Sequence, residues 1–401
     1  MQERVPLLIF LMVCLMTVAY STIGIYTPAM PAIAAHFGAT PGEVQLTFST
    51  YLVAFSFGQL VYGPLSDRYG RRPAILAGLA IYVLGSAMSA LSTSIEMLIV
   101  ARAVQAFGGC AGPVLARAIM RDLFDRDEGA RLMAFVAMVM GVAPAFAPVL
   151  GGYLQVAFGW ESIFWVLTGV GGLVLVLFVV LLKETRPGSD RGVGGSILTM
   201  LMVYPRLLRS RAFVGHTLTA GFAMATIFVY IASAPFVFIE LLGVPPDLYG
   251  WYSLIPTFFN LGGAAFATRY TVRLGAERMI LFGSVLVFAG AMAMVGLALA
   301  GFLTILAMVG PMSVVAFGLS NVFPSAAQSA VSVATRQAGA ASSLNGFITM
   351  LVASVAVVVV GVLPSGSDQM PMAMVVGAMG VLTMVALVLT RRFGASAPVG
   401  E

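Results

Sequence analysis

A short charged segment between two long apolar runs holds the residues best suited to act as a switch. Residues 63–73 read Gly-Pro-Leu-Ser-Asp-Arg-Tyr-Gly-Arg-Arg-Pro. An acid beside arginines at a tight turn can form ion pairs that break and re-form when neighbouring elements move. A cluster that only set topology would need positive charge and no Gly-flanked Asp-Arg pair, so we favour a gating role. The predicted gating motif comprises Gly63, Asp67, Arg68, Gly70, Arg71, Arg72 and Asp122, and any of its three arginines could pair with Asp122.

A second group lies inside a largely apolar run. Arg102 stands six residues after Glu96, which is about 9 Å along a helix. A charge at that depth of a membrane helix is costly unless it faces a cavity or a partner, so we expect Arg102 and Gln105 to organise a polar network that influences a proton carrier. The alternative is an arginine that reaches back to the headgroups. For Arg117, cavity lining and such snorkelling stand as equal alternatives.

The composition places these residues in a bilayer. Hydrophobic residues make up 60% of the chain and charged residues 9%, with a mean hydropathy of +1.00. Runs that are apolar on every face predict helices and exclude a β-barrel, whose strands would alternate in polarity. We therefore predict an all-α integral membrane protein with twelve transmembrane helices in two six-helix bundles. The expected spans are 5–35, 44–66, 73–95, 96–121, 132–160, 162–182, 212–239, 248–268, two within 279–335, 337–367 and 369–390.

The basic residues predict the orientation of these spans. Except for Arg102 and Arg117, all 21 Lys and Arg fall on one side if the N-terminus is cytoplasmic. Both termini are then expected in the cytoplasm, and the net charge of +5 reflects topology and not nucleic-acid binding. Cys14 and Cys110 both lie in predicted helices, so no disulfide framework is expected.

The chain reads as two halves of one pattern. Gly38 and Gly243, Pro41 and Pro246, Arg68 and Arg273, and Gly70 and Gly275 are each separated by 205 residues. The one long hydrophilic connection lies between the halves. We predict an N-terminal bundle in residues 1–182, a cytoplasmic linker in 183–211 and a C-terminal bundle in 212–401, with a substrate cavity between the bundles.

Four segments resemble a known family. Residues 63–73 resemble the signature of the major facilitator superfamily, and residues 102–108 with 116–124, 147–152 and 183–186 resemble the bicyclomycin/chloramphenicol resistance (Bcr/CflA) subfamily of drug/proton antiporters. The resemblance implies a monomeric exporter of small amphipathic molecules in the bacterial inner membrane. It also implies alternating access, energy from the proton gradient, and no cofactor.

Small residues recur on one face of the expected fifth helix. They are Gly141, Pro144, Pro148, Gly151 and Gly152. Their spacing alone is compatible with ordinary close packing of membrane helices. The resemblance assigns them to the antiporter motif of the family.

Aromatic and neutral polar residues are the candidates for the substrate cavity. An apolar, aromatic pocket with few hydrogen-bonding groups suits amphipathic molecules better than sugars. For any one tyrosine, packing or an interfacial position is the competing interpretation. The candidates are Tyr20, Tyr26, Tyr51, Phe55, Tyr230, Asn260, Asn321 and Asn345.

The sequence departs from the family in one place that bears on energy coupling. Related exporters usually carry an acid on the first helix just before a Tyr-x-Pro step, where this chain has Gly24. No Asp or Glu falls in the middle of an expected span, so coupling would use Asp67, Asp122 or His216. The alternative is a facilitator or symporter of a small metabolite. A membrane enzyme or scaffold is disfavoured, because no metal-ligand cluster, nucleophile-base pair or phosphate-binding glycine loop appears in the expected cytoplasmic segments.

Overall fold

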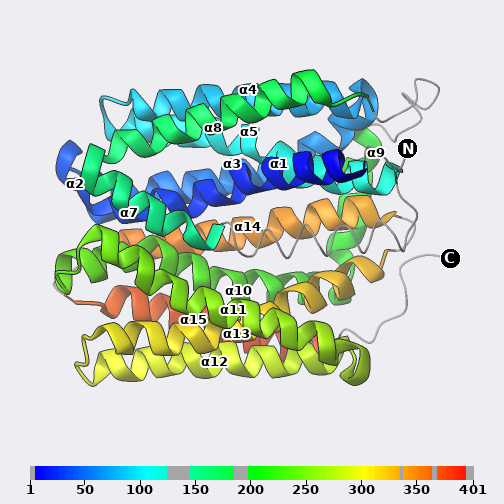
Figure 1. The fold of residues 1–401 in the computed structure, drawn as a ribbon. Coiled ribbons are helices and arrows are strands. Elements are labelled where there is room, and N and C mark those ends of the chain that lie inside the picture. Colours follow the sequence, from blue (N-terminus) through cyan, green and yellow to red (C-terminus); the bar gives the residue numbers. More distant parts are fainter. Residues whose placement is uncertain (1–4, 124–143, 185–196, 335–336, 364–367, 394–401) are drawn as a thin grey trace.

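The computed structural model describes residues 5–123, 144–184, 197–334, 337–363 and 368–393, and every regular element in these ranges is a helix (Figure 1). Ten helices in these ranges are long and apolar enough to cross a membrane. The first starts as α1 and continues through a 3-10 turn, Thr27–Ala29, into α2. Their bounds are α1 Val5–Ile25 with α2 Met30–Phe37, α3 Pro41–Tyr69, α4 Arg71–Ala90, α5 Ile95–Leu123, α8 Trp160–Leu181, α10 Arg211–Pro235, α12 Ala276–Leu299, α13 Ile305–Ser332, α14 Ala338–Val362 and α15 Met370–Phe393.

Two further helices occupy the places of the remaining predicted spans. Helix α11, Pro246–Leu274, has 29 residues and is about 44 Å long, but its aromatic residues, Pro256 and Asn260 lower its hydropathy. Helix α7, Ala147–Phe158, is the described part of the expected span 132–160. Residues 124–143 lie outside the described residues. The linker contains one short helix, α9, Ile197–Arg209.

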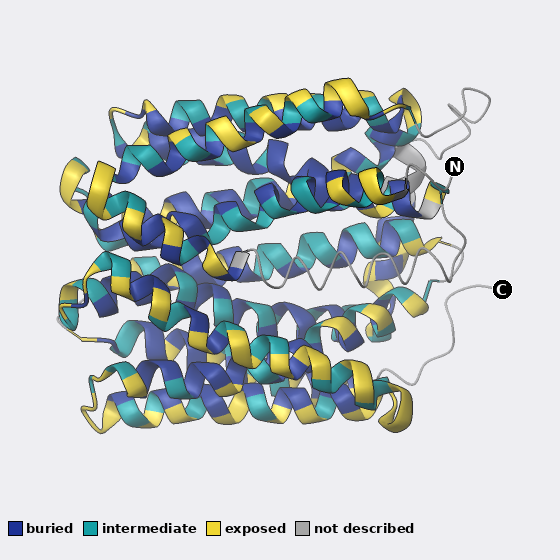
Figure 2. Ribbon diagram, in the orientation of Figure 1, coloured by how far each residue is buried: buried dark blue, intermediate teal, exposed yellow. Residues whose placement is uncertain are grey.

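The helices run side by side along one axis and form two bundles (Figure 1). Helices α1 to α8 make the first bundle and α10 to α15 the second, which confirms the predicted all-α membrane fold. We call the end that holds α9 and the turn between α3 and α4 the linker face, on the right in Figure 1. The other end, which holds the turn between α2 and α3, is the opposite face. Exposed side chains alternate with buried ones along the outer helices (Figure 2), as expected where lipid surrounds the protein.

The internal repeat is present in the backbone. Helices α3 and α11 both have 29 residues, and each begins and ends 205 positions from the other. The glycine that follows each helix has a positive φ and an extended ψ, 103° and 158° at Gly70 and 81° and 156° at Gly275. This conformation is essentially restricted to glycine. The two glycines therefore turn the chain in the same way, from α3 into α4 and from α11 into α12.

A capping box fixes the start of α3 at the opposite face. The side-chain oxygen of Thr40 accepts a hydrogen bond from the Glu43 N–H at 3.3 Å, and the Glu43 carboxylate accepts one from the Thr40 N–H at 2.7 Å. Pro41 occupies the first turn, where no intrahelical donor is needed.

Helices α3 and α14 form an antiparallel seam between the bundles. At the opposite face, Gly42 meets the carbonyl of Gly361 with no room for a side chain. Further along, the Ser354 hydroxyl donates to the Ser49 carbonyl at 2.9 Å, and Gln59 packs on Gly346. A second seam joins α7 to α11, where Gly152 packs on Pro246 and Gly250 on Val149. Glycines thus allow the closest approach of the two bundles.

Candidate functional site

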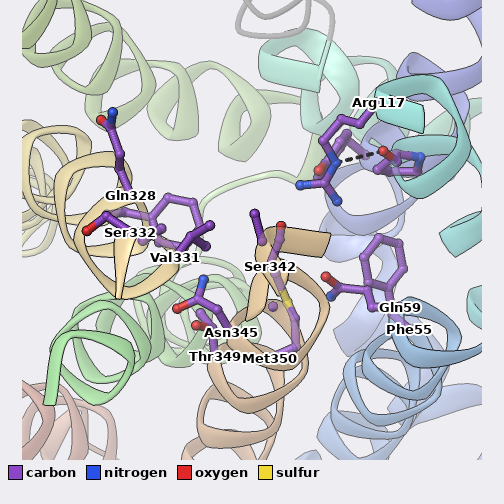
Figure 3. Close-up of a pocket in the computed structure, with 16 residues that line it drawn as sticks. Phe55, Gln59, Arg117, Gln328, Val331, Ser332, Ser342, Asn345, Thr349 and Met350 are labelled. Atoms are coloured by element: carbon purple, nitrogen blue, oxygen red, sulfur yellow. Dashed lines mark hydrogen bonds between the residues drawn. The ribbon is translucent and has the colours of Figure 1, made fainter. Parts of the chain in front are cut away.

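A cavity of about 730 Å³ lies between the two bundles in the linker-face half (Figure 3). Five helices contribute to its wall, α1, α3 and α5 from the first bundle and α13 and α14 from the second. Its volume falls in the range of pockets that hold drug-sized ligands. The lining residues that matter below are Tyr20, Phe55, Gln59, Pro113, Arg117, Phe323, Gln328, Asn345, Thr349 and Met350.

Direct contacts between the bundles fill the opposite-face half. The Gln45 amide donates to the Ala232 carbonyl and to the Ser233 hydroxyl, both at 3.3 Å. The rings of Phe48 and Phe228 have centroids 5.9 Å apart. Together with the Gly42 contact, these interactions separate the cavity from the opposite face.

The structure places three of the eight predicted cavity residues in the wall, namely Tyr20, Phe55 and Asn345. Tyr26 and Tyr51 are fully buried within the first bundle, and Tyr230 is buried in the second. The Asn260 amide donates to the Ala316 carbonyl at 3.0 Å and the Asn321 amide to the Phe317 carbonyl at 2.7 Å. The Asn260 bond joins α11 to α13, whereas the Asn321 bond lies within α13, and neither asparagine is among the residues that line the cavity.

The cavity wall also contains polar residues that sequence reasoning missed. Gln59, on α3, and Thr349, on α14, each lie one turn beyond a residue that was predicted, Phe55 and Asn345 respectively. Helical spacing from those candidates is the signal that could have found them. Arg117 is also among the residues that line this cavity.

The predicted gating motif forms a compact ion cluster at the linker face. Arg71, only 6% exposed, lies with its guanidinium 2.8 Å from one oxygen of Asp67 and 2.8 Å from one oxygen of Asp122. The other two arginines have different contacts: Arg68 lies over the ring of Tyr69, and Arg72 donates to the Val179 carbonyl at 2.7 Å. The expected pairing with Asp122 is therefore made by Arg71.

A small cavity of about 120 Å³ connects this cluster to the second bundle. Asp67, Arg71 and Asp122 form one side, and Gly339 and Ser342 in the first turns of α14 form the other. Gly63 and Arg117 also border it. The ion cluster thus lies against the positive end of the α14 dipole, which favours negative charge there.

Glu184 is a further member of the cluster, and its contacts could not be read from the sequence. Its carboxylate accepts hydrogen bonds from the backbone N–H groups of Arg71 at 3.0 Å and Arg72 at 3.3 Å. It thereby caps the N-terminus of α4, where a negative charge is favourable. The carboxylate also lies against the α-carbon of Gly70, where a side chain would collide with it.

Arg102 is fully buried in the first bundle and surrounded by aromatic rings. Its guanidinium carbon lies 4.3 Å from the ring centre of Tyr26, 4.4 Å from that of Tyr51 and 5.8 Å from that of Phe164. The hydrogen bonds and ion pairs of the described residues give it no carboxylate partner. Cation–π attraction to these rings takes the place of a counter-ion. Such an attraction is worth about 2 kcal/mol when the pair is shielded from water.

A chain of hydrogen bonds extends from Arg102 across the bundle. Its Nη1 donates to Gln105 Oε1 at 2.5 Å, and Gln105 Nε2 donates to the Ser86 hydroxyl at 2.8 Å. The Ser86 hydroxyl donates in turn to the Tyr82 carbonyl at 2.8 Å. The Tyr82 hydroxyl lies 2.7 Å from that of Thr22 on α1. The network predicted around Arg102 and Gln105 therefore links α5, α4 and α1.

Helix α7 packs between α1 and α11, and small residues of the predicted antiporter motif make both contacts. Gly151 packs on the Ile25 carbonyl and Gly152 on that of Pro246. A side chain at Gly24 would meet the Pro148 ring at 3.4 Å, so the position of the usual family acid is a helix contact here. Pro144 lies in the 3-10 turn Pro144–Phe146, and Gly141 lies outside the described residues.

Comparison with known proteins identifies the family. The family model described as Major Facilitator Superfamily matches residues 11–357. The chain belongs to the major facilitator superfamily. It is 33% identical over 370 residues to the uncharacterised transporter YdgK of Bacillus subtilis, covering 90% of both chains. It is 29% identical over 343 residues to a bicyclomycin resistance protein homologue of Haemophilus influenzae, covering 83% of both.

The fold has close counterparts among solved structures of this superfamily. One is a bacterial homologue of the human lysosomal transporter Spinster, solved in an inward-facing and unoccupied conformation. It superposes with a TM-score of 0.76 at 14% identity, covering 98% of this chain and 99% of that one. The superfamily assignment makes this chain a transporter and not an enzyme, as the motifs predicted.

Proposed function

We propose that the chain exports small amphipathic compounds from the bacterial cytoplasm by alternating access with proton antiport, as a monomer in the inner membrane. The observation that carries this proposal is a drug-sized cavity between two bundles of a major facilitator chain, closed at one end by glycine seams. The bicyclomycin resistance homologue among the relatives supports drugs as the cargo.

The linker face is assigned to the cytoplasm in this proposal. It carries the basic residues that the positive-inside rule places there, including Arg68, Arg206 and Arg269. The cavity lies in this half, so the structure corresponds to a state that takes up cargo from the cytoplasm. Export requires the bundles, residues 1–182 and 212–401, to rock about the linker 183–211 until the seams part and the linker face closes.

The ion cluster of Asp67, Arg71 and Asp122 is the proposed cytoplasmic gate. Its position against the first turns of α14 supports this role, because rocking of the bundles must change that contact. Protonation of Asp67 would remove one of the two charges that hold Arg71, and so would weaken the cluster. A proton can thereby alter the balance between the two states.

Arg102 is proposed to hold α1, α4 and α5 in one arrangement and to supply a fixed positive charge within the first bundle. Its hydrogen-bond chain to Thr22 supports this role. The small residues of α7, which contact both α1 and α11, are proposed to carry movement from this bundle to the second.

A facilitator or symporter without proton antiport is the second candidate. It is favoured by Gly24, which packs against Pro148 where relatives usually carry an acid, and by the absence of Asp and Glu among the residues that line the larger cavity in the described part of the chain. This candidate shares the fold and the cavity and differs only in coupling.

Drug susceptibility of a pump-deficient bacterium that expresses the chain tests the main proposal. We expect raised resistance to several amphipathic antibiotics and loss of that resistance when a protonophore collapses the gradient. Proteoliposomes with and without a pH gradient separate the candidates, because movement indifferent to the gradient would favour the facilitator. Wild-type susceptibility to every compound tested would contradict export.

A further inference from the structure

The charge of the larger cavity wall indicates a narrower class of cargo than amphipathic compounds in general. Arg117 is the one charged residue among those that line it in the described part of the chain. Asp67 and Asp122 lie in the adjoining small cavity, where each is within 2.8 Å of the Arg71 guanidinium. The surface that a bound molecule would touch therefore carries a positive charge and no negative one.

The geometry of Arg117 directs that charge into the cavity. Its Nε donates to the carbonyl of Pro113 on its own helix at 2.9 Å, which fixes the stem of the side chain. The guanidinium then extends into the cavity (Figure 3). Among the described residues its hydrogen bond uses Nε alone, which leaves the two Nη groups for a ligand. A planar guanidinium with paired donors matches a carboxylate or sulfonate.

Two buried acceptors lie on the facing helix. Asn345 is 6% exposed and Thr349 is 1% exposed, and the Oδ1 of Asn345 and the hydroxyl of Thr349 have no hydrogen-bond partner among the described residues. Both residues line the cavity, where Figure 3 shows them side by side. Buried polar atoms without partners are costly, so a ligand that donates a hydrogen bond here would relieve that cost.

Apolar side chains complete the wall. Tyr20, Phe55, Phe323 and Met350 offer rings and a thioether to a hydrophobic body. The N-terminus of α14, at Ala338, also lies in the wall and adds the positive end of a helix dipole.

We infer that the cargo of this cavity is an amphipathic organic anion with a hydrogen-bond donor next to its apolar body. Its anionic group pairs with Arg117, and its donor bonds to Asn345. This inference rests on the proposed function and narrows the substrate class of the same site.

Three probes that share one fluorophore test the inference on the purified full-length protein. Dansylglycine is an anion, dansylamide is neutral and dansylcadaverine is a cation. We expect calorimetric titration at neutral pH to give a dissociation constant for dansylglycine about tenfold below that for dansylamide, the difference expected for one partly shielded charge pair. Dansylcadaverine should bind most weakly.

Variants assign the preference to the named residues. Arg117→Gln should remove the difference between anion and neutral probe, whereas Arg117→Lys should keep most of it. Asn345→Leu should weaken both probes by about threefold to tenfold and leave their ratio unchanged. Arg269→Gln, which removes an exposed arginine from α11 outside the cavity wall, is the matched control and should bind all probes as the wild type does.

Several results would overturn the inference. They are equal affinity for anion and neutral probe, preference for the cation, a preference that survives Arg117→Gln, or binding of none of the probes. Tighter binding of the cation would show that the carboxylates of the small cavity determine which ligand charge is preferred. Resistance to neutral or cationic drugs alone would refute the anion inference and leave export intact, whereas anion binding without any transport would refute export and leave the site intact.

Discussion

Helix α3 in the first bundle and helix α11 in the second have the same length and the same glycine turn, but their linker-face ends carry different chemistry. The position of Asp67 corresponds to Val272, which is 91% exposed, and that of Arg71 corresponds to Ala276. Measured from the starts of α5 and α13, the position of Arg102 corresponds to Met312, which is fully buried. The repeat sets the backbone of both bundles, and among the described residues the cluster of Asp67, Arg71 and Asp122 belongs to the first bundle, without a counterpart at the matching positions of α11 and α12.

The largest effect on export is expected when Arg102 is replaced by methionine, the residue at the equivalent position 312 of the second bundle. Arg102→Met removes the cation–π contacts with Tyr26 and Tyr51, and we expect export to fall by about 100-fold or more. The melting temperature should change little, because the desolvation cost of a buried charge disappears while the buried Gln105 Oε1 loses its donor. Met312→Leu is the control and should change neither. Wild-type resistance in the Arg102 variant would remove this residue from the mechanism.

The second test removes the charge of Asp67 from the proposed gate, because the equivalent residue of α11, Val272, is uncharged. Asp67→Asn removes the charge that faces Arg71 at 2.8 Å, and turnover in proteoliposomes should drop roughly tenfold to 100-fold while membrane insertion stays normal. The loss is smaller than for a fully buried pair because the Asp67 side chain is 29% exposed. The matched change at the equivalent position, Val272→Asn, should leave turnover unchanged. Equal losses in both variants would show that the gate is shared between the bundles.

The third test concerns the two glycine turns. Gly70→Ala and Gly275→Ala should each destabilise the protein by about 1–3 kcal/mol, because both positions have a backbone conformation that alanine rarely adopts. The loss should be larger at Gly70, where the new side chain also collides with the Glu184 carboxylate, than at Gly275, which has open space. Thermal unfolding of the detergent-solubilised variants gives the ranking, and the reverse order would contradict the structure.

The smallest effects are expected for two acids, Glu184, which caps the start of α4, and Glu277, in the first turn of α12. Glu184→Gln weakens two charge-assisted caps and should cost about 1 kcal/mol of stability. Glu277, at the start of α12, is 59% exposed and lies 3.8 Å from Arg391, so Glu277→Gln should change stability by less than about 0.5 kcal/mol. Thermal unfolding in the same detergent checks both. A larger effect at Glu277 would mean that the second bundle has its own ion lock.

Sequence reasoning reached the fold because its signals are local. Apolar runs, charge placement and repeated glycines each depend on neighbouring residues, and they predicted the helices and the turn at Gly70 correctly. The sequence also predicted that an arginine of residues 63–73 could pair with Asp122, but it did not distinguish among Arg68, Arg71 and Arg72. The motif roles stay predictions until the variants above are made.

The contacts that sequence reasoning missed depend on how distant helices dock. Glu184 reaches the start of α4 only because the end of α8 lies beside it, and no spacing rule connects positions so far apart. The rings around Arg102 come from the turn after α1, from α3 and from α8. The sequence could show only that a charge at that depth requires a cavity or a partner. Asn260 looked suited to a ligand, but the packing of α11 on α13 gives its amide the Ala316 carbonyl instead. The Asn321 amide bonds the Phe317 carbonyl one turn earlier in its own helix.

The meeting of Gly42 with Gly361 has a practical consequence. Two residues without side chains touch backbone to backbone there, so the fit leaves no tolerance for even one extra carbon atom. A methyl group introduced by Gly42→Ala would act as a wedge that penalises this conformer and spares any conformer in which the two helices have separated. One small substitution, outside the larger cavity and the ion cluster of Asp67, Arg71 and Asp122, would thus favour the conformer in which the opposite face has opened.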